Sequence, residues 1–368
     1  MKVCSINKMK YFFELLQVAL GNRAFLSGAP TSEEWEVIYR LATEQSVLGL
    51  VLAGIETANV RPPQELLLQW IGDVQILEQQ NKEMNVFIAE LIERLRKADI
   101  YTLLVKGQGI AQCYEKPLWR TCGDVDFYLS NSNYNIAKDY LKTLATHVDG
   151  EDKKRLHAGM MIDSWTVELH GSLHSDFSNG MNKVLDEVHQ AIFYGGEVRS
   201  WNDNGIPVFL PSADNDVIIV FTHFLQHFYV GGVGLRQICD WCRLLWTYRK
   251  KIDVNLLESR IRKAGLMTEW RAFAALAVEY LGMPVETMPL YSESRCYRKK
   301  AGRLMKMILK AGNFGHSIND ESYRAKYSGL KADMITFFRR LKEFAKLSLI
   351  FPKNGPRFFL GYVLWRLK

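Results

Sequence analysis

Residues 103–129 read LLVKGQGIAQCYEKPLWRTCGDVDFYL and join two apolar segments through a glycine-containing turn. The first apolar segment, 101–105, is predicted to be a strand, 106–109 a turn and 110–114 a short helix. A glycine-containing turn between a strand and a helix exposes backbone N–H groups, which attract anions. This arrangement predicts a binding site for a negatively charged group close to the turn.

A pair of aspartates follows in the second apolar segment, which is predicted to be a strand over 124–129. Asp124 and Asp126 alternate with Val125 and Phe127, and alternate side chains of a strand project to the same face. Two neighbouring carboxylates on a half-buried strand repel each other, so the pattern favours a divalent cation such as Mg²⁺ between them. The alternative is an Asp pair that only serves a turn at the strand end.

A third carboxylate and two cations extend this candidate site. The stretch 166–170, TVELH, is β-branched and apolar, and it is predicted to be a strand with Glu168 and His170 on one face. Lys106 in the turn and Arg120, four residues before the first aspartate, are candidate partners for phosphate groups. No Ser or Thr follows the lysine as a P-loop requires, so a P-loop is not predicted.

The residues above resemble the nucleotidyltransferase superfamily typified by DNA polymerase β, and within it a group of uncharacterised nucleotidyltransferases. The resemblance is carried by Lys106-Gly107, Arg120, Asp124-Val125-Asp126 and Val167-Glu168-Leu169-His170, and more weakly by residues 235–240.

The resemblance implies a reaction and a set of site residues. Asp124, Asp126 and Glu168 are expected to hold two Mg²⁺ ions, with Mn²⁺ as an alternative. A nucleoside monophosphate would move from a nucleoside triphosphate onto an acceptor hydroxyl or phosphate. The residues expected to bind the triphosphate are Lys106, Gly107, Gln108 and Arg120, and those expected to support the site from behind are His170 and Arg236. The acceptor, whether small molecule, protein or nucleic acid, is not indicated.

Length and composition are those of a soluble globular protein. The chain has 368 residues, of which 48% are hydrophobic and 24% charged. It contains no apolar run of about 18 residues, the length that a membrane span needs. The basic N-terminus is followed by an amphipathic segment rather than a signal sequence, and the six cysteines are scattered. These features predict a cytoplasmic protein with reduced thiols.

The pattern along the chain predicts an α+β fold, with a small mixed β-sheet between two helical regions. Residues 1–98 are predicted to form a helical region, 99–210 the nucleotidyltransferase core, and 211–368 a helical region with a basic end. Helices are predicted over 11–19, 31–41, 65–97, 133–146, 179–193, 214–229, 235–248, 253–264, 268–281 and 295–310, and further strands over 156–162, 164–169 and 206–211.

Charge is distributed unevenly. Residues 294–368 contain 18 Lys and Arg against four Asp and Glu, a net charge of +14, whereas the whole chain carries +7, so residues 1–293 carry −7. Either the two parts neutralise each other or the basic part contacts an anionic partner. The second alternative leads to a different function, a catalytically silent scaffold that binds a polyanion or a protein through residues 294–368. The aromatic and basic end of the chain is expected to pack on its own protein.

Three short patterns have competing interpretations. His223 and His227 have the spacing of a zinc-binding helix but lack the glutamate of zinc peptidases, so a core or cleft-lining position is favoured over metal binding. The CDWC sequence at 239–242 lies in an apolar helix without a second cysteine pair, which argues against zinc or redox use. Arg236 and Asp240 share a helix face, where they either pair with each other or place Arg236 in the cleft.

Overall fold

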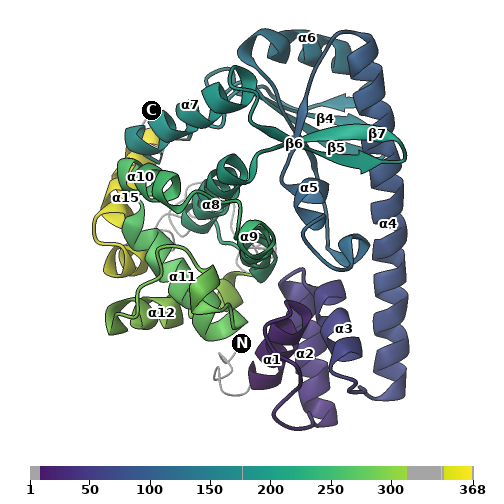
Figure 1. Ribbon diagram of the computed structural model, residues 1–368, viewed down its shortest axis with the longest axis vertical. Coiled ribbons are helices and arrows are strands. Elements are labelled where there is room, and N and C mark those ends of the chain that lie inside the picture. Colours follow the sequence, from purple (N-terminus) through teal and green to yellow (C-terminus); the bar gives the residue numbers. More distant parts are fainter. Residues whose placement is uncertain (1–8, 176, 313–340, 342–343, 367–368) are drawn as a thin grey trace, which may run out of the picture.

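The computed structural model describes residues 9–175, 177–312, 341 and 344–366. Figure 1 shows a small sheet with the long helix α4 (Gln64–Lys97) running along one side of it, α6 (Asn131–Lys142) above it, and most of the remaining helices on the other side and below. The predicted α+β class, with a small mixed sheet and helices before and after it, is confirmed. In the part of the chain that the structure describes, no helix combines the length and apolarity needed to cross a membrane.

Four helices come before the sheet. The second begins with a capping box, in which Thr31 Oγ1 accepts from the backbone N–H of Glu34 and Glu34 Oε2 accepts from the backbone N–H of Thr31 at 2.8 Å. This confirms the helix start predicted from sequence. The four helices are α1 (Lys10–Ala19), α2 (Ser32–Glu44), α3 (Leu48–Thr57) and α4 (Gln64–Lys97).

The main sheet has five strands in the order β1-β2-β5-β4-β3. β2 pairs with β5 in parallel, and the other neighbours are antiparallel. Most of these strands were predicted, including the hairpin that turns at Asp163. The expected helix through residue 146 was too long, because α6 ends at Lys142 and the chain then forms β3. The strands are β1 (Leu103–Val105), β2 (Val125–Tyr128), β3 (His147–Val148), β4 (His157–Ile162) and β5 (Trp165–His170), and the two short helices among them are α5 (Gly107–Ala111) and α6 (Asn131–Lys142).

A second, two-stranded sheet consists of β6 (Val198–Asp203) and β7 (Ile206–Pro211). β7 was predicted, whereas β6 was not. β7 packs beside β1, and its Leu210 explains one glycine of the predicted turn. A Cβ at Gly109 would lie 2.7 Å from Leu210 Cδ2, so a larger residue would require the Leu210 side chain to move.

Helices dominate the rest of the described chain. The six α-helices between residues 179 and 311 agree with the predicted bounds to within one residue, whereas the last helix was not predicted. These helices are α7 (Asn179–Phe193), α8 (Ala213–Val230), α9 (Leu235–Tyr248), α10 (Val254–Ala264), α11 (Met267–Leu281), α12 (Arg295–Ala311) and α15 (Asn354–Arg366), with the 3-10 turns η2 (Pro117–Trp119) and η3 (Val285–Thr287). Residues 313–340 of the predicted basic end lie outside the described residues.

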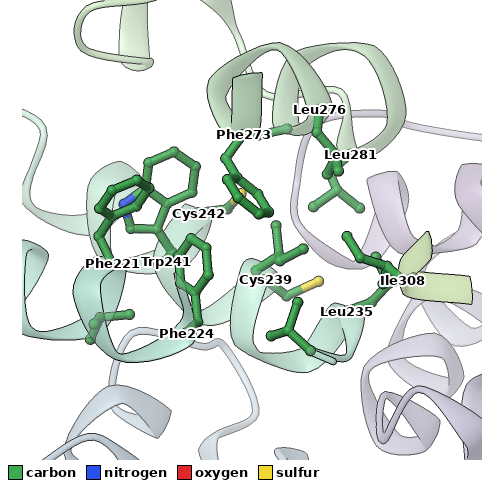
Figure 2. Close-up of a cluster of buried hydrophobic side chains, with 14 of the residues drawn as sticks. Phe221, Phe224, Leu235, Cys239, Trp241, Cys242, Phe273, Leu276, Leu281 and Ile308 are labelled. Carbon is green, nitrogen blue, oxygen red and sulfur yellow. The ribbon is translucent and has the colours of Figure 1, made fainter. Parts of the chain in front are cut away.

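The larger hydrophobic core joins helices from both ends of the chain. Figure 2 shows its aromatic part, where Phe221 and Phe224 of α8 surround Trp241 of α9. Trp241 meets Trp270 edge to face, with ring centroids 4.9 Å apart. Buried residues of α1, among them Phe12, belong to the same core. The N-terminal helices therefore pack with the C-terminal ones, and the predicted division at residues 98 and 210 stays a prediction.

A smaller core lies on one face of the main sheet. Its members come from the second half of α4, from α6 and from alternate positions of the strands, such as Val125 and Phe127 of β2 and Val167 and Leu169 of β5. The side chains between these positions point to the opposite face. That opposite face carries the aspartates and histidines described next.

Candidate active site

Asp126 and Glu168 lie side by side on neighbouring strands. β2 and β5 are parallel and in register, with Asp126 opposite Glu168 and Tyr128 opposite His170. Because their apolar neighbours fill the core on the other face, both carboxylates project from the same side of the sheet. Asp124 precedes β2 and remains exposed to solvent. The period of two in the sequence, combined with this register, gathers the acidic residues at one end of β2.

The turn after β1 brings a lysine to these carboxylates. Lys106 Nζ lies 2.6 Å from Asp126 Oδ1, and the two side chains are 13% and 9% exposed. The Lys106 backbone has φ 60° and ψ −146°, a region that is comfortable only for glycine and costs other residues about 1–3 kcal/mol. Gly107 follows with φ +38°. The chain therefore keeps a strained backbone at the position whose side chain reaches the buried aspartate.

Two histidines contact the same carboxylates. His170 Nε2 lies 2.9 Å from Asp126 Oδ1 and 3.5 Å from Glu168 Oε2. His157, on β4 directly opposite His170, places Nε2 3.3 Å from Glu168 Oε2. The His157 and His170 rings are 4.8 Å apart. Both imidazoles therefore face Glu168, and one of them also bridges to Asp126.

The electrostatics separate the three carboxylates. Hydrogen bonds from His157 and His170 hold the pKa of Glu168 well below its usual range. Burial alone would raise the pKa of Asp126, but Lys106 and His170 outweigh it, so the pKa is lowered. At Asp124 the balance is the opposite: partial burial, then the charges of Asp126 and Glu168, raise its pKa, and Lys106 and Arg236 offset this rise only in part. Asp126 and Glu168 are therefore ionised at neutral pH.

Two more histidines line the site from α8. His223 Nε2 and His227 Nε2 are 3.1 Å apart. Burial, then the charge of Lys106, lowers the pKa of both, in His227 to about 4. Asp126 also acts on both rings electrostatically, which places the pair next to the carboxylates. The cleft-lining position favoured from sequence agrees with this placement.

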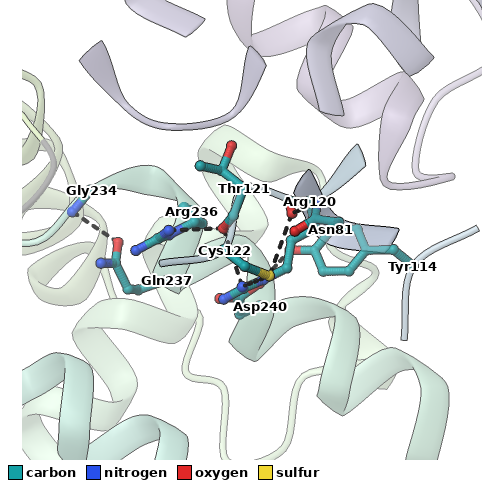
Figure 3. A network of polar contacts seen from close by, with 9 residues as sticks. All are labelled: Asn81, Tyr114, Arg120, Thr121, Cys122, Gly234, Arg236, Gln237 and Asp240. Carbon is teal, nitrogen blue, oxygen red and sulfur yellow. Dashed lines mark hydrogen bonds and ion pairs between the residues drawn. The ribbon is translucent and has the colours of Figure 1, made fainter. Parts of the chain in front are cut away.

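Arg120 does not lie among the carboxylates. As Figure 3 shows, it turns toward α9, where Nε lies 3.0 Å from Asp240 Oδ1 and Nη2 lies 2.6 Å from Asp240 Oδ2. The Tyr114 hydroxyl donates to the same carboxylate at 2.8 Å. Arg120 and Asp240 are both buried. The triphosphate-binding role expected of Arg120 stays a prediction that these contacts do not support, because its guanidinium is engaged in a bidentate ion pair inside the protein.

Gln108 is likewise part of the framework. Its side chain is 2% exposed and donates to Asn81 Oδ1 at 3.0 Å. Asn81 in turn donates to the backbone oxygens of Leu118 and Arg120 at 2.7 and 2.9 Å. Of the predicted nucleotide-binding residues, Lys106 and Gly107 lie at the carboxylates, whereas the Gln108 side chain points into the interior.

Arg236 is closer to the site than its helix neighbour Asp240. Its Nη1 donates to the Thr121 carbonyl at 2.8 Å, three residues before Asp124 (Figure 3). Its charge also acts on Asp124, whose pKa it lowers in part. Of the two alternatives from sequence, the contacts favour a position at the edge of the cleft, while Asp240 pairs with Arg120 instead.

The donor set fits divalent cations. Asp126 and Glu168 stand opposite each other on β2 and β5, Asp124 lies two residues before Asp126, and Lys106, His157 and His170 contact Asp126 or Glu168. Carboxylate oxygens are the ligands that Mg²⁺ takes in proteins. Asp124, Asp126 and Glu168 are thus the residues that would hold such ions.

His157 was missed from sequence, although a signal for it existed. The hairpin turning at Asp163 was predicted, and pairing Ile162 with Trp165 sets His157 opposite His170. Counting five residues back from Ile162 and five forward from Trp165 would have placed the second imidazole at Glu168.

The resemblance to nucleotidyltransferases rests on a strand, a glycine turn and a short helix, followed by aspartates at the start of the next strand and a carboxylate on its parallel neighbour. The model of the family described as uncharacterised nucleotidyltransferase matches residues 31–282, and the chain belongs to this family. Neither the curated proteins nor the solved structures include a match to the chain.

Proposed function

We propose that the protein moves a nucleoside monophosphate from a nucleoside triphosphate onto an acceptor hydroxyl or phosphate, with two divalent cations at the site. Membership of the nucleotidyltransferase family supports the general activity. One observation carries the finer proposal. Asp126 and Glu168, both ionised, stand in register on the parallel strands β2 and β5. Lys106, in the turn after β1, forms an ion pair with Asp126.

The proposal gives each residue of the site a role that follows from its position. Asp124, Asp126 and Glu168 would hold the two Mg²⁺ ions, which, when bound, lower the pKa of the acceptor hydroxyl and offset the charge of the leaving pyrophosphate. Lys106 supplies a positive charge at the turn, where the phosphates of the donor would lie. Arg236 fixes the backbone at Thr121 and so positions the segment that carries Asp124.

The acceptor belongs to a separate part of the proposal. On α12 the residues Arg295, Lys299, Arg303 and Lys306 are exposed and spaced three or four apart, so they share one face of the helix. This face lies within the described part of the basic region 294–368, and we propose it as a contact surface for an anionic partner. Residues 313–340, 342–343 and 367–368 of that region lie outside the described chain.

The first experiment measures thermal unfolding with ATP, with and without Mg²⁺. We expect stabilisation only when both are present, about 2.7 kcal/mol at a ligand concentration of 100 Kd. Asp126→Asn should abolish it, because the variant removes a cation ligand. Asp139→Asn is the matched control. The Asp139 side chain is 73% exposed on α6, and in the described part of the chain its ion pair is with nearby Lys142.

The same measurement separates the enzyme from a silent scaffold. A scaffold that only binds a polyanion would show no Mg²⁺-dependent stabilisation by ATP, and equal stabilisation of Asp126→Asn and wild type would also contradict the proposal. Incubation with labelled nucleoside triphosphates and a cell extract then identifies the acceptor by the molecule that takes up the label.

A further inference from the structure

The side chains around Glu168 differ from a purely carboxylate site. His157 Nε2, one oxygen of Glu168 and His170 Nε2 all lie within 4.8 Å of one another. The three come from adjacent strands, with His157 and His170 directly opposite in the β4–β5 ladder and Glu168 two residues before His170. Gly159 stands opposite Glu168, and the Asp149 side chain occupies the space over this glycine, with Oδ2 2.6 Å from where a Cβ would lie.

The distances match those between ligands of one metal ion. Zn²⁺ binds imidazole nitrogen and carboxylate oxygen at about 2.0–2.2 Å in a tetrahedral arrangement, which sets neighbouring ligand atoms about 3.3 Å apart. His157 Nε2 and His170 Nε2 lie 3.3 and 3.5 Å from Glu168 Oε2. Asp126 Oδ1 lies 2.9 Å from His170 Nε2 on the side toward Lys106.

The nitrogen ligands change which ion this position selects. Mg²⁺ keeps to oxygen ligands and water, whereas imidazole suits Zn²⁺ and other first-row transition metals. From this geometry we propose that His157, Glu168 and His170 form a binding site for a divalent transition-metal ion, distinct in its preference from the Asp124–Asp126 end of the site. The proposal deepens the proposed function and rests on it in one respect, that Glu168 belongs to both ion positions.

The nearby charges are consistent with this use. Two imidazole nitrogens point at the same Glu168 oxygen, and the His170 nitrogen is shared between two carboxylates. In this structure hydrogen bonds join the two imidazole nitrogens to the carboxylate oxygens. A cation bound between these atoms would replace those hydrogen bonds. Three protein ligands leave one coordination position open, as in catalytic zinc sites.

The test is calorimetric titration of metal-free protein with Zn²⁺ and, separately, with Mg²⁺. We expect one Zn²⁺ to bind at least about 100-fold more tightly in wild type than in His157→Ala, beyond the loss of about 10–100-fold typical of an outer hydrogen-bond partner. His147→Ala is the matched control, because His147 is a strand histidine whose side chain is 73% exposed. Its Zn²⁺ affinity should equal that of wild type.

Two outcomes would overturn the inference. One is that wild type binds Zn²⁺ no more tightly than Mg²⁺, and the other is that His157→Ala keeps the wild-type Zn²⁺ affinity. Thermal stabilisation by Mg²⁺ and ATP, measured on His157→Ala, confirms that the variant folds. It also separates the two proposals. A wild-type Zn²⁺ affinity in His157→Ala, with Mg²⁺–ATP stabilisation intact, rejects only the transition-metal site. Absence of Mg²⁺–ATP stabilisation in wild type, with Zn²⁺ binding that depends on His157, rejects only the proposed function. Glu168→Gln provides a second variant, which should lose Zn²⁺ binding to a similar degree.

Discussion

Replacing Lys106 by methionine removes the charge nearest to Asp126 while keeping a long side chain in place. The ion pair spans 2.6 Å between side chains that are 13% and 9% exposed. Coulomb's law with an effective dielectric constant of about 20 gives roughly 6 kcal/mol at this separation. Desolvation offsets part of this attraction, and His170 remains 2.9 Å from Asp126. We therefore expect the free energy of unfolding to fall by about 3 kcal/mol, the lower end for breaking a buried ion pair.

A divalent cation should restore much of this loss. Lys106 and a bound cation compete for the same Asp126 carboxylate, so removing the lysine frees a ligand for the ion. In urea unfolding with and without Mg²⁺, the ion should stabilise Lys106→Met by at least about 1.4 kcal/mol more than wild type, which corresponds to a tenfold smaller Kd. The matched control is Lys82→Met, because Lys82 pairs with Glu78 on the surface of α4 with 52% of its side chain exposed. It should change stability by less than about 1 kcal/mol.

The double variant Lys106→Met/Asp126→Asn decides the cause. Without Mg²⁺ it should be more stable than Lys106→Met alone, because neutral asparagine leaves no uncompensated charge in the interior. Equal stabilisation of wild type and Lys106→Met by Mg²⁺ would refute the competition between lysine and cation. The lysine would then have a structural role only.

Three further predictions concern other parts of the molecule. Arg120→Met should lower the free energy of unfolding by about 3–5 kcal/mol, because it leaves the buried Asp240 carboxylate without its partner. The folded variant should keep the ATP affinity of wild type. A tenfold loss of ATP affinity in a binding titration would show instead that Arg120 contacts the triphosphate. His227 is neutral in the folded protein, with a pKa lowered to about 4, so its contribution to stability is complete above pH 6.5 and is lost as the pH falls toward 4. In urea unfolding over this pH range, His227→Asn should lose up to about 3 kcal/mol less of its free energy of unfolding than wild type. The same dependence of stability on pH in both proteins would contradict the assignment. If residues 294–368 contact a nucleic acid, binding to a mixed RNA pool should weaken steeply between about 50 and 200 mM salt, and no binding at the lower salt would exclude nucleic acid as the acceptor.

The local parts of this fold could be predicted from sequence because their signals are local. The α9 helix begins and ends where its apolar period does, at Leu235 and Tyr248. The alternation around Asp126 placed its side chain opposite the apolar positions, as the core of the sheet confirms. The β6 strand lacks such a signal, because Trp201 is its one large apolar residue on the less exposed side and the remaining positions are mostly polar.

The partners of the charged residues could not be predicted in the same way. Arg120 and Asp240 are 120 residues apart, and nothing in the spacing indicates that Arg120 rather than Arg236 pairs with Asp240. Gln108 belongs to a glycine turn that is typical of anion binding, but its side chain is fixed by Asn81, 27 residues earlier. Which polar side chains face the site and which face the interior depends on how distant helices pack around the turn.

The length of α4 has a consequence for how the molecule can move. This helix runs unbroken over 34 residues, about 51 Å at 1.5 Å per residue. Leu66 and Trp70 of its first half are buried in the larger core, and Ile88 and Leu91 of its second half in the smaller one. At the changeover Asn81 binds the backbone of the segment that leads to the aspartates. A hinge motion between the two cores would require this continuous helix to bend. We therefore expect substrates to enter by movements of loops and side chains at the site, and not by opening of one half of the protein against the other.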